Sequence, residues 1–194
     1  MEQSLILIKP DGVQRALVGQ IISRFARAGL KIVALKLVKP SFDQVDRHYA
    51  LTEEWMKGVY DKAKAKFDAE GKAFQYADHK AYGEYIKKGL VDFLLSSPVV
   101  AMVAEGEAAV SLVRKIVGVT EPASAAPGTI RGDFSPDTYA LSNGQDRPLR
   151  NLIHASGNVQ EAGTEIPIWF TPEEIFPINA AIDPVLYGAD RFRP

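Results

Sequence analysis

The sequence predicts an α+β fold of the ferredoxin-like, split β-α-β kind, in which a four-stranded, mainly antiparallel sheet carries helices on one face. Segments of strand and helix character alternate along the chain in the order β-α-β-(α)-β-α-(α)-β. Hydrophobic residues make up 46% of the 194 residues, which is enough for one sizeable core. No internal repeat or linker divides the chain, so we expect a single domain over residues 1–194.

The first half of the sheet is expected from two apolar segments. Residues 5–8 are all Leu or Ile and predict a buried strand, which a Pro-Asp-Gly turn ends. Residues 30–38 predict a second strand, rich in Ile, Val and Leu. Between them, residues 17–28 place four apolar side chains on one helical face, namely Leu17, Ile21, Ile22 and Phe25. Ser41 is suited to cap a short helix that continues to about residue 51.

The second half is expected from three more segments. Residues 98–103 predict the central strand, because they are apolar without interruption. In residues 107–117 the apolar and polar side chains recur with the period of a helix. Residues 158–161 have the spacing of a capping box at the start of a short helix. Residues 165–170 predict the last strand, and Pro167 confines it to an edge of the sheet.

Two stretches do not belong to this minimal pattern and are expected to be surface insertions. Residues 52–88 are dense in Lys and Glu and predict a helical excursion, whose tyrosines are Tyr60, Tyr76, Tyr82 and Tyr85. Residues 135–150 form a turn-rich loop. Either insertion is suited to bind a ligand, but reinforcement of the fold or of a subunit contact is the simpler interpretation of both.

The overall composition excludes several classes of protein. With 23 basic and 24 acidic side chains, the formal net charge is -1, so no global charge draws the chain to nucleic acid or to anionic lipid. The chain has no cysteine, which excludes disulfides, thiol catalysis and cysteine-ligated metal sites and fits a reducing compartment. No apolar stretch approaches the roughly 18 residues of a membrane span. We therefore expect a cytoplasmic protein with no membrane partner and no export signal.

The familiar phosphate-binding motifs are missing, but three basic residues remain as candidates. There is no P-loop and no G-x-G-x-x-G turn. Lys9 closes the first predicted strand, Arg114 faces out from the helix over residues 107–117, and Arg131 lies in a Gly-Pro-rich loop. Each one alone is more simply a solvated surface charge. Together, at strand ends and adjoining loops, they would favour a polyphosphate.

Of the three histidines, His154 is the candidate for chemistry. His48 is expected on a polar helix face and His79 in the charged insertion, both in solvent. His154 follows an apolar pair and precedes small residues, so it lies near the core with room for a ligand. A hydrogen-bonded structural histidine is an equally good interpretation of this position. Glu165 is expected to reach one ring nitrogen of His154, which would fix the tautomer and free the other nitrogen to attack.

Five segments of the chain, taken in order, resemble the nucleoside diphosphate kinase family. They are residues 7–15 (LIKPDGVQR), His48-Tyr49, residues 98–103 (PVVAMV), residues 128–134 (GTIRGDF) and residues 151–156 (NLIHAS). The match extends from about Leu5 to Phe170 and is broken by the two insertions. Any one segment is moderately specific, and five in register make the resemblance strong.

The resemblance implies a ferredoxin-like fold and an enzyme that transfers the γ-phosphate of a nucleoside triphosphate to a nucleoside diphosphate. The substrates would include ATP, GTP, ADP, GDP and their deoxy forms. It also implies a magnesium ion (Mg2+), a ping-pong cycle through a phosphohistidine, and a homo-oligomer, commonly a hexamer. No residue of the chain is assigned as a metal ligand.

The resemblance also assigns roles to individual residues. The nucleophile matches His154, which would attack through Nδ1. The carboxylate on its opposite nitrogen matches Glu165, and the neighbouring hydroxyl matches Ser156. The nucleotide-binding residues match Lys9, Tyr49, Arg114, Thr120, Arg131 and Asn151.

The chain departs from the family pattern in several places. Ala155 and Gly157 stand where the family most often has Gly and Asp. The aromatic residue that stacks on the base falls on Ile86 by counting back from Pro98, although Tyr85 or Tyr82 would take that role if the insertion shifts the register. Residues 52–88 stand where the family has a short helix beside the nucleotide cleft. Residues 171–194 are expected to pack on a neighbouring subunit.

Two other functions fit parts of this pattern. A non-catalytic member of the same fold would bind nucleotide or nucleic acid without phosphotransfer, but His154, Glu165, Lys9 and Arg131 are retained together. A different phosphohistidine transferase is not distinguished by the nucleophile alone.

Overall fold

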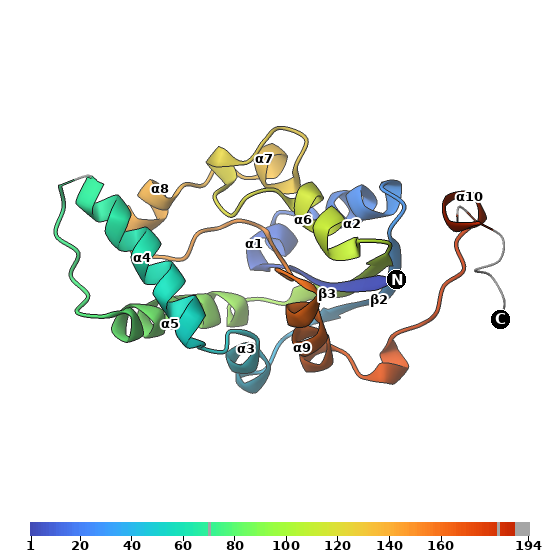
Figure 1. Cartoon of the computed structure of the whole chain (residues 1–194), viewed down its shortest axis with the longest axis horizontal. Coiled ribbons are helices and arrows are strands. Elements are labelled where there is room, and N and C mark those ends of the chain that lie inside the picture. The colour runs from blue at the N-terminus through green and yellow to red at the C-terminus, as the bar shows by residue number, and fades with distance from the viewer. Residues whose placement is uncertain (70, 182, 189–194) are drawn as a thin grey trace.

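Four antiparallel strands form the centre of the protein (Figure 1). A computed structural model describes residues 1–69, 71–181 and 183–188. The strands are β1 (Glu2–Ile8), β2 (Lys31–Val38), β3 (Val99–Gly106) and β4 (Ile153–Ala155). Their order across the sheet is β2-β3-β1-β4, and each neighbouring pair is antiparallel. The predicted α+β class with a four-stranded sheet is therefore confirmed.

Helices cover both faces of the sheet, whereas the sequence predicted one covered face (Figure 1). On one side lie α2 (Val18–Arg27), α6 (Ala109–Val117) and α7 (Ile130–Phe134), whose buried residues join Ile6, Ile8 and Met102. On the other lie α3 (Phe42–His48), α5 (His79–Leu95) and α9 (Val159–Trp169), which pack on Leu5, Leu7 and Val103. Because β1 and β3 are apolar on both faces, each face requires a cover.

The prediction of a last strand over residues 165–170 is wrong. Residues 165–169 lie in the helix α9, and Phe170 is the residue that follows its end. Asn158 caps α9 by accepting the backbone N–H of Glu161 (2.8 Å), as the capping pattern predicted. Its buried residues are Ala162, Glu165, Ile166 and Trp169, a helical spacing that the sequence contains. Pro167 therefore lies inside a helix and not at a sheet edge. The fourth strand is instead β4, three residues long and centred on His154.

The first half of the chain follows the prediction with one change. Helix α2 buries Ile21 and Phe25, and Ser41 caps α3 with Gln44 in a reciprocal capping box. After β1, the expected Pro-Asp-Gly turn is the start of a short helix, α1 (Pro10–Gln14). Proline suits the first turn of a helix, because the backbone N–H it lacks would have no helical partner there.

The two insertions pack on one another and form a helical lobe. The first contributes α4 (Glu53–Ala69) and most of α5, and the second contributes α8 (Tyr139–Gly144). Along α5, residues 85, 89 and 93 contact residues 146, 148 and 150: the Tyr85 hydroxyl donates to Asp146, Pro148 lies against Gly89, and Arg150 lies over the ring of Phe93. These contacts hold the second insertion against α5.

The C-terminal part of the described chain runs beside the sheet. It contains a short 3-10 helix, η2 (Pro172–Glu174), and α10 (Asp183–Tyr187); another 3-10 helix, η1 (Pro122–Ser124), precedes α7. The backbone N–H of Phe176 donates to the carbonyl of Val33 in β2 (2.8 Å). The expected packing of residues 171–194 on a neighbour falls partly on residues 182 and 189–194, outside the described residues. Among the described helices, none has both the length and the apolar character to cross a membrane.

Candidate active site

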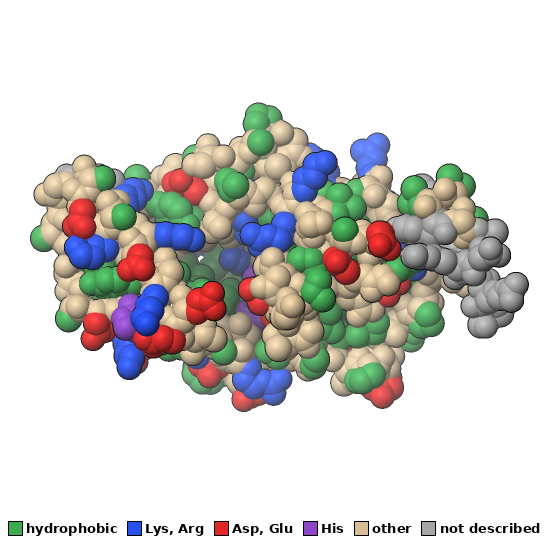
Figure 2. Space-filling view, in the orientation of Figure 1, with side chains coloured by type: hydrophobic (Ala, Val, Ile, Leu, Met, Phe, Trp, Pro, Cys, Tyr) green, Lys and Arg blue, Asp and Glu red, His purple; other side chains and the backbone are tan. Residues whose placement is uncertain are grey.

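A hollow opens between the helical lobe and the sheet, with Lys and Arg side chains at its rim and a histidine on its wall (Figure 2). Several segments meet in this region. Strand β4 pairs with β1, which places His154 opposite Leu7, and Lys9 follows at the end of β1. The backbone N–H of Lys9 donates to the carbonyl of Leu152 (2.8 Å).

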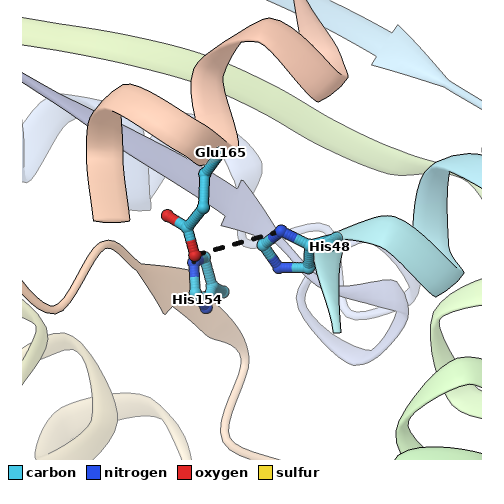
Figure 3. Close-up of side chains that lie close together, drawn as sticks. All are labelled: His48, His154 and Glu165. Carbon is cyan, nitrogen blue, oxygen red and sulfur yellow. Dashed lines mark ion pairs between the residues drawn. The ribbon is translucent and has the colours of Figure 1, made fainter. Parts of the chain in front are cut away.

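His154 and Glu165 lie in direct contact (Figure 3). Nε2 of His154 is 2.9 Å from Oε1 of Glu165, although the angle is not that of a linear hydrogen bond. The other carboxylate oxygen of Glu165 accepts from the hydroxyl of Ser156 (2.6 Å), and Ser156 in turn accepts from the backbone N–H of Leu5 (3.1 Å). Glu165 is thus fixed by the sheet through Ser156, and its contact with Nε2 leaves Nδ1 of His154 for chemistry.

His48 is buried beside His154, so the expectation of a solvated residue is wrong. The two imidazoles meet edge to face with centroids 4.5 Å apart, and the Trp169 indole N–H donates to Nδ1 of His48 (3.4 Å). Burial, with the charges of His154 and Lys9, holds the pKa of His48 well below its usual value. His48 is therefore a neutral side chain that fixes the position of His154 by contact.

His48, His154 and Glu165 also form a group of possible metal ligands, since one donor atom from each lies within 4.8 Å of the others. Two imidazoles and one carboxylate are typical of zinc or iron sites. Magnesium prefers oxygen ligands, so this group does not fit a magnesium ion.

Lys9, Asn151 and Thr120 are connected by the side chain of Asn151. The Lys9 ammonium donates to Oδ1 of Asn151 (2.8 Å), and Nδ2 of Asn151 donates to the carbonyl of Thr120 (3.0 Å). Burial, followed by the charge of Arg131, lowers the pKa of Lys9 to about 8, and Asp11 partly opposes this. A buried ammonium with few counter-charges is well suited to donate to a phosphate oxygen.

Arg131 holds the backbone around the histidine. Its guanidinium donates to the carbonyls of Asn151 (3.3 Å), Gly118 (2.9 Å) and Ile153 (2.7 Å). A guanidinium has five N–H donors, so two remain for a ligand. Burial and the charge of Arg114 lower the pKa of Arg131 to about 10, which leaves it charged at neutral pH.

Leu152 adopts a strained backbone conformation between Asn151 and His154. Its φ is 68°, and the N–H of Ile153 donates to the carbonyl of Asn151 (2.8 Å), which is the hydrogen bond of a γ-turn. The positive-φ form of this turn is rare, and a non-glycine residue in it costs about 1–3 kcal/mol. The Leu152 N–H donates to Oδ2 of Asp11 (3.0 Å). Strain of this kind at a candidate site is characteristic of a geometry held for function.

The side chains of the remaining predicted residues, Tyr49, Arg114 and Thr120, make no hydrogen bond to the rest of the site within the part of the chain that the structure describes. Tyr49 meets His48 edge to face at 4.8 Å, and burial raises the pKa of its hydroxyl. Arg114 is exposed and lines a shallow recess of about 510 Å³ with Glu2, Gly157 and Asn158. Thr120 is exposed and joins the site through its carbonyl alone.

Ile86 is half-buried on α5. In the described part of the chain, no hydrogen bond, ion pair or ring contact joins Ile86, Tyr82 or Tyr85 to His154 or to the basic residues. Tyr82 and Tyr85 already contact the ring of Tyr76 at 4.9 Å and 5.1 Å. The base-stacking residue thus stays a prediction.

The sequence reasoning missed His48, Trp169 and Asp11. Val45 and His48 are three residues apart on α3, and both are buried. The helical spacing of His48 from an apolar residue therefore indicated that it faces the core. The same spacing within residues 159–169 would have found Trp169. Nothing in the local sequence indicates that Asp11 contacts Leu152, which is 141 residues away.

The comparison with protein families gives one match. A family model described as "Nucleoside diphosphate kinase" matches residues 2–70 and 60–175. A nucleoside diphosphate kinase of Pyrobaculum aerophilum is 45% identical over 179 residues, which cover 90% of this chain and 98% of the relative. One from Synechococcus elongatus is 40% identical over 187 residues, covering 96% and 99%.

Solved structures agree with the sequence matches. The crystal structure of an NDP kinase from Pyrobaculum aerophilum is similar with a TM-score of 0.87 and 44% identity, covering 91% of this chain and 99% of that one. A transition-state mimic of nucleoside-diphosphate kinase from Borrelia burgdorferi, with bound vanadate and ADP, has a TM-score of 0.78 and 36% identity, covering 96% and 97%.

The three bonds from Arg131 predict a structural role for this side chain. We expect Arg131→Ala to lower the free energy of unfolding by about 2–4 kcal/mol, because three carbonyls lose a charged donor. Arg131→Lys should recover part of the loss, since an ammonium cannot reproduce the guanidinium fork. Urea denaturation measures both. Arg114→Ala, at an exposed position, is the control and should change stability by less than about 0.5 kcal/mol; equal effects at the two positions would contradict this role.

Proposed function

Because the chain belongs to the nucleoside diphosphate kinase family, and is therefore a phosphotransferase acting between nucleoside triphosphates and diphosphates, we propose that His154 is its nucleophile. The observation that carries this proposal is the contact of Nε2 with Glu165, which leaves Nδ1 of a half-buried imidazole available. Neutral imidazole is a good nucleophile near neutral pH.

The proposed reaction has two steps. The Nδ1 lone pair attacks the γ-phosphorus of a triphosphate such as ATP or GTP, an N–P bond forms, and the P–O bond to the departing diphosphate breaks. A terminal oxygen of an incoming diphosphate then attacks the same phosphorus, and the N–P bond breaks to restore neutral His154. Glu165, held by Ser156, stabilises the positive charge that develops on the ring during attack.

We assign phosphate binding to Lys9, Arg114 and Arg131, with Tyr49, Thr120 and Asn151 beside them and Ile86 against the base. Phosphoryl transfer mainly requires in-line positioning and charge neutralisation. Lys9 is suited to both, since its ammonium is buried and oriented by Asn151. Within the described part of the chain, Arg131 keeps two N–H donors beyond its three backbone bonds.

The family needs a divalent cation, and we propose magnesium. The only cluster of three possible metal ligands among the described residues is rich in imidazole and unsuited to magnesium. Nucleotide-bound magnesium takes most of its ligands from phosphate and water. The basic residues of the site fit that arrangement, because they would bind the phosphate oxygens that the metal ion does not coordinate. When bound, the ion would neutralise phosphate charge and align the chain of phosphates.

We also propose that residues 1–194 form one domain, which assembles as a homo-oligomer in the cytoplasm. The packing of the two insertions on each other supports one domain, and the absence of cysteine suits a reducing compartment. Exposed apolar side chains on the edge strand β2 and at the start of α3 favour self-association: Leu35, Leu37 and Phe42 are 52%, 67% and 64% exposed. We propose a hexamer from the family resemblance.

Labelling tests the nucleophile. Incubation with γ-labelled ATP should place acid-labile label on the protein, and an added nucleoside diphosphate should remove it. His154→Ala should carry no label, whereas His79→Ala, in the helical lobe, should be labelled as the parent is. A labelled His154→Ala protein would contradict the proposal.

The lowered pKa of Lys9 predicts a decline of activity at high pH. Above about pH 8 the free enzyme loses the ammonium charge, so kcat/KM should fall while kcat, which reports the nucleotide complex, falls at higher pH. The unfolded chain keeps this proton up to about pH 10.5, so the contribution of Lys9 makes the free energy of unfolding rise with pH between about 8 and 10.5, and unfolding does not explain the decline. The Lys9→Arg variant should not show this decline of kcat/KM, because a guanidinium stays charged over the same pH range. A level kcat/KM from pH 7 to 9.5 would contradict the assignment.

Light scattering tests the assembly. We expect a mass near six times the 21.2 kDa of one chain. Leu37→Glu should lower it, because a charge would be buried at the contact, while Glu121→Gln, far from β2 in the sequence, should not. A monomeric parent protein at micromolar concentration would overturn the proposal.

A further inference from the structure

We propose that Asp11 is a positioning residue of the phosphotransfer site, which acts through the backbone N–H of Leu152 to hold the γ-turn between Asn151 and His154. This inference rests on the proposed role of His154 and extends it to a residue whose hydrogen bond goes to the backbone of Leu152 and not to the imidazole.

The γ-turn needs outside contacts because its central residue is strained. Leu152 is fully buried, with φ 68°. The three carbonyls of residues 151–153 all receive donors: Arg131 bonds the first and third, and the backbone N–H of Lys9 bonds the second. The N–H of Leu152 differs, because its acceptor is the carboxylate of Asp11 (3.0 Å). Without that acceptor a buried donor would be left unpaired.

The short helix α1 brings Asp11 to this donor. Only Lys9 separates β1 from Pro10, which begins the helix, and Asp11 is the next residue. The helix lies so close to the turn that a Cβ at Gly12 would be 3.1 Å from the Leu152 carbonyl and 2.7 Å from Cγ2 of Ile8. Asp11 is only 6% exposed, and its other oxygen, Oδ1, is buried without a hydrogen-bond partner in the described part of the protein.

Asp11 also supplies a negative charge next to the buried cations. It raises the pKa of both Lys9 and Arg131, against the effect of burial. Removing Asp11 would therefore remove a hydrogen bond and a charge together. An asparagine separates these effects, since its side-chain oxygen can still accept the N–H of Leu152 while the charge is lost.

The turn has groups of the site on both sides. Asn151 orients the ammonium of Lys9, and His154 follows two residues after Leu152. A shift of the turn would move the amide and the imidazole relative to each other. A displacement of about 1 Å can cost on the order of 100-fold in rate when reacting atoms must be aligned.

The test compares three variants of the full-length protein. Asp11→Ala should lower kcat, per folded molecule, by about tenfold or more, with a smaller change in KM. Asp11→Asn should stay within about threefold of the parent, because the acceptor is kept. Asp11→Leu, which fills the volume without an acceptor, should behave as Asp11→Ala does and replaces it if the alanine variant does not fold. Amide exchange at Leu152 should accelerate in the variants without an acceptor and stay slow in Asp11→Asn.

Asp183 provides a matched control. It is also buried and accepts one backbone N–H through Oδ2 (from Ala180, 2.8 Å), and its Oδ1 has no hydrogen-bond partner among the described residues. It differs in forming an ion pair with Lys31 (3.7 Å) and in lying in α10, at the opposite end of the molecule from α4 (Figure 1). Asp183→Ala should lower stability and leave kcat per folded molecule unchanged. Any of three results would overturn the proposal. The first is an equal loss of kcat in Asp11→Asn and Asp11→Ala, and the second is a kcat of Asp11→Ala within about threefold of the parent. The third is a loss of kcat in Asp183→Ala as large as that in Asp11→Ala.

Failure of this inference is distinguishable from failure of the proposed function. If the parent protein is labelled at His154 and the Asp11 variants match it, only the positioning role is wrong. If His154→Ala is still labelled, the nucleophile is wrong, while amide exchange at Leu152 continues to report whether Asp11 holds the turn.

Discussion

The contact between His154 and Glu165 is the constraint on which the site depends. It joins the three-residue strand β4 to the helix α9, and Ser156 ties the same carboxylate to the first strand through Leu5. His48 contacts the imidazole edge to face as a neutral ring, and it accepts a hydrogen bond from Trp169 of α9. The reactive ring is therefore held by the core of the protein, and a rigid surround is what in-line phosphoryl transfer requires.

The cations of the site are held at a cost that a polyphosphate would offset. Burial lowers the pKa of Lys9 and of Arg131; the charge of Arg131 lowers the pKa of Lys9 further, and the charge of Arg114 does the same to Arg131. The hydrogen bonds of Arg131 stabilise the backbone, but the closeness of the like charges is unfavourable in the empty protein. An anionic substrate would remove this repulsion, because its oxygens would neutralise the buried charges in the complex. Asp11 limits the cost by its charge and holds the strained turn by its hydrogen bond.

The sequence alone predicted much of this molecule, and its failures have physical causes. Three of the four strands and the α2, α3 and α6 helices follow from periodicity and capping residues. The last strand was misassigned because Pro167 and a short apolar run suggested an edge strand, while the helical spacing of Ala162, Glu165 and Trp169 was overlooked. Lys9, Arg114, Arg131 and His154 were candidates from their residue types and positions, and the resemblance then assigned their roles. Asp11 was not a candidate, because its bond to Leu152 joins residues that only the folded chain brings together.

The most direct test of the central claim is the position of the phosphoryl group on the imidazole. Phosphorylated protein with 15N-labelled histidine can be examined by NMR, where phosphorus couples to the nitrogen that carries it. Because Glu165 faces Nε2, we expect the phosphorus on Nδ1 of His154. Phosphorus on Nε2 would show that this carboxylate does not hold the ring as described, and would contradict the account.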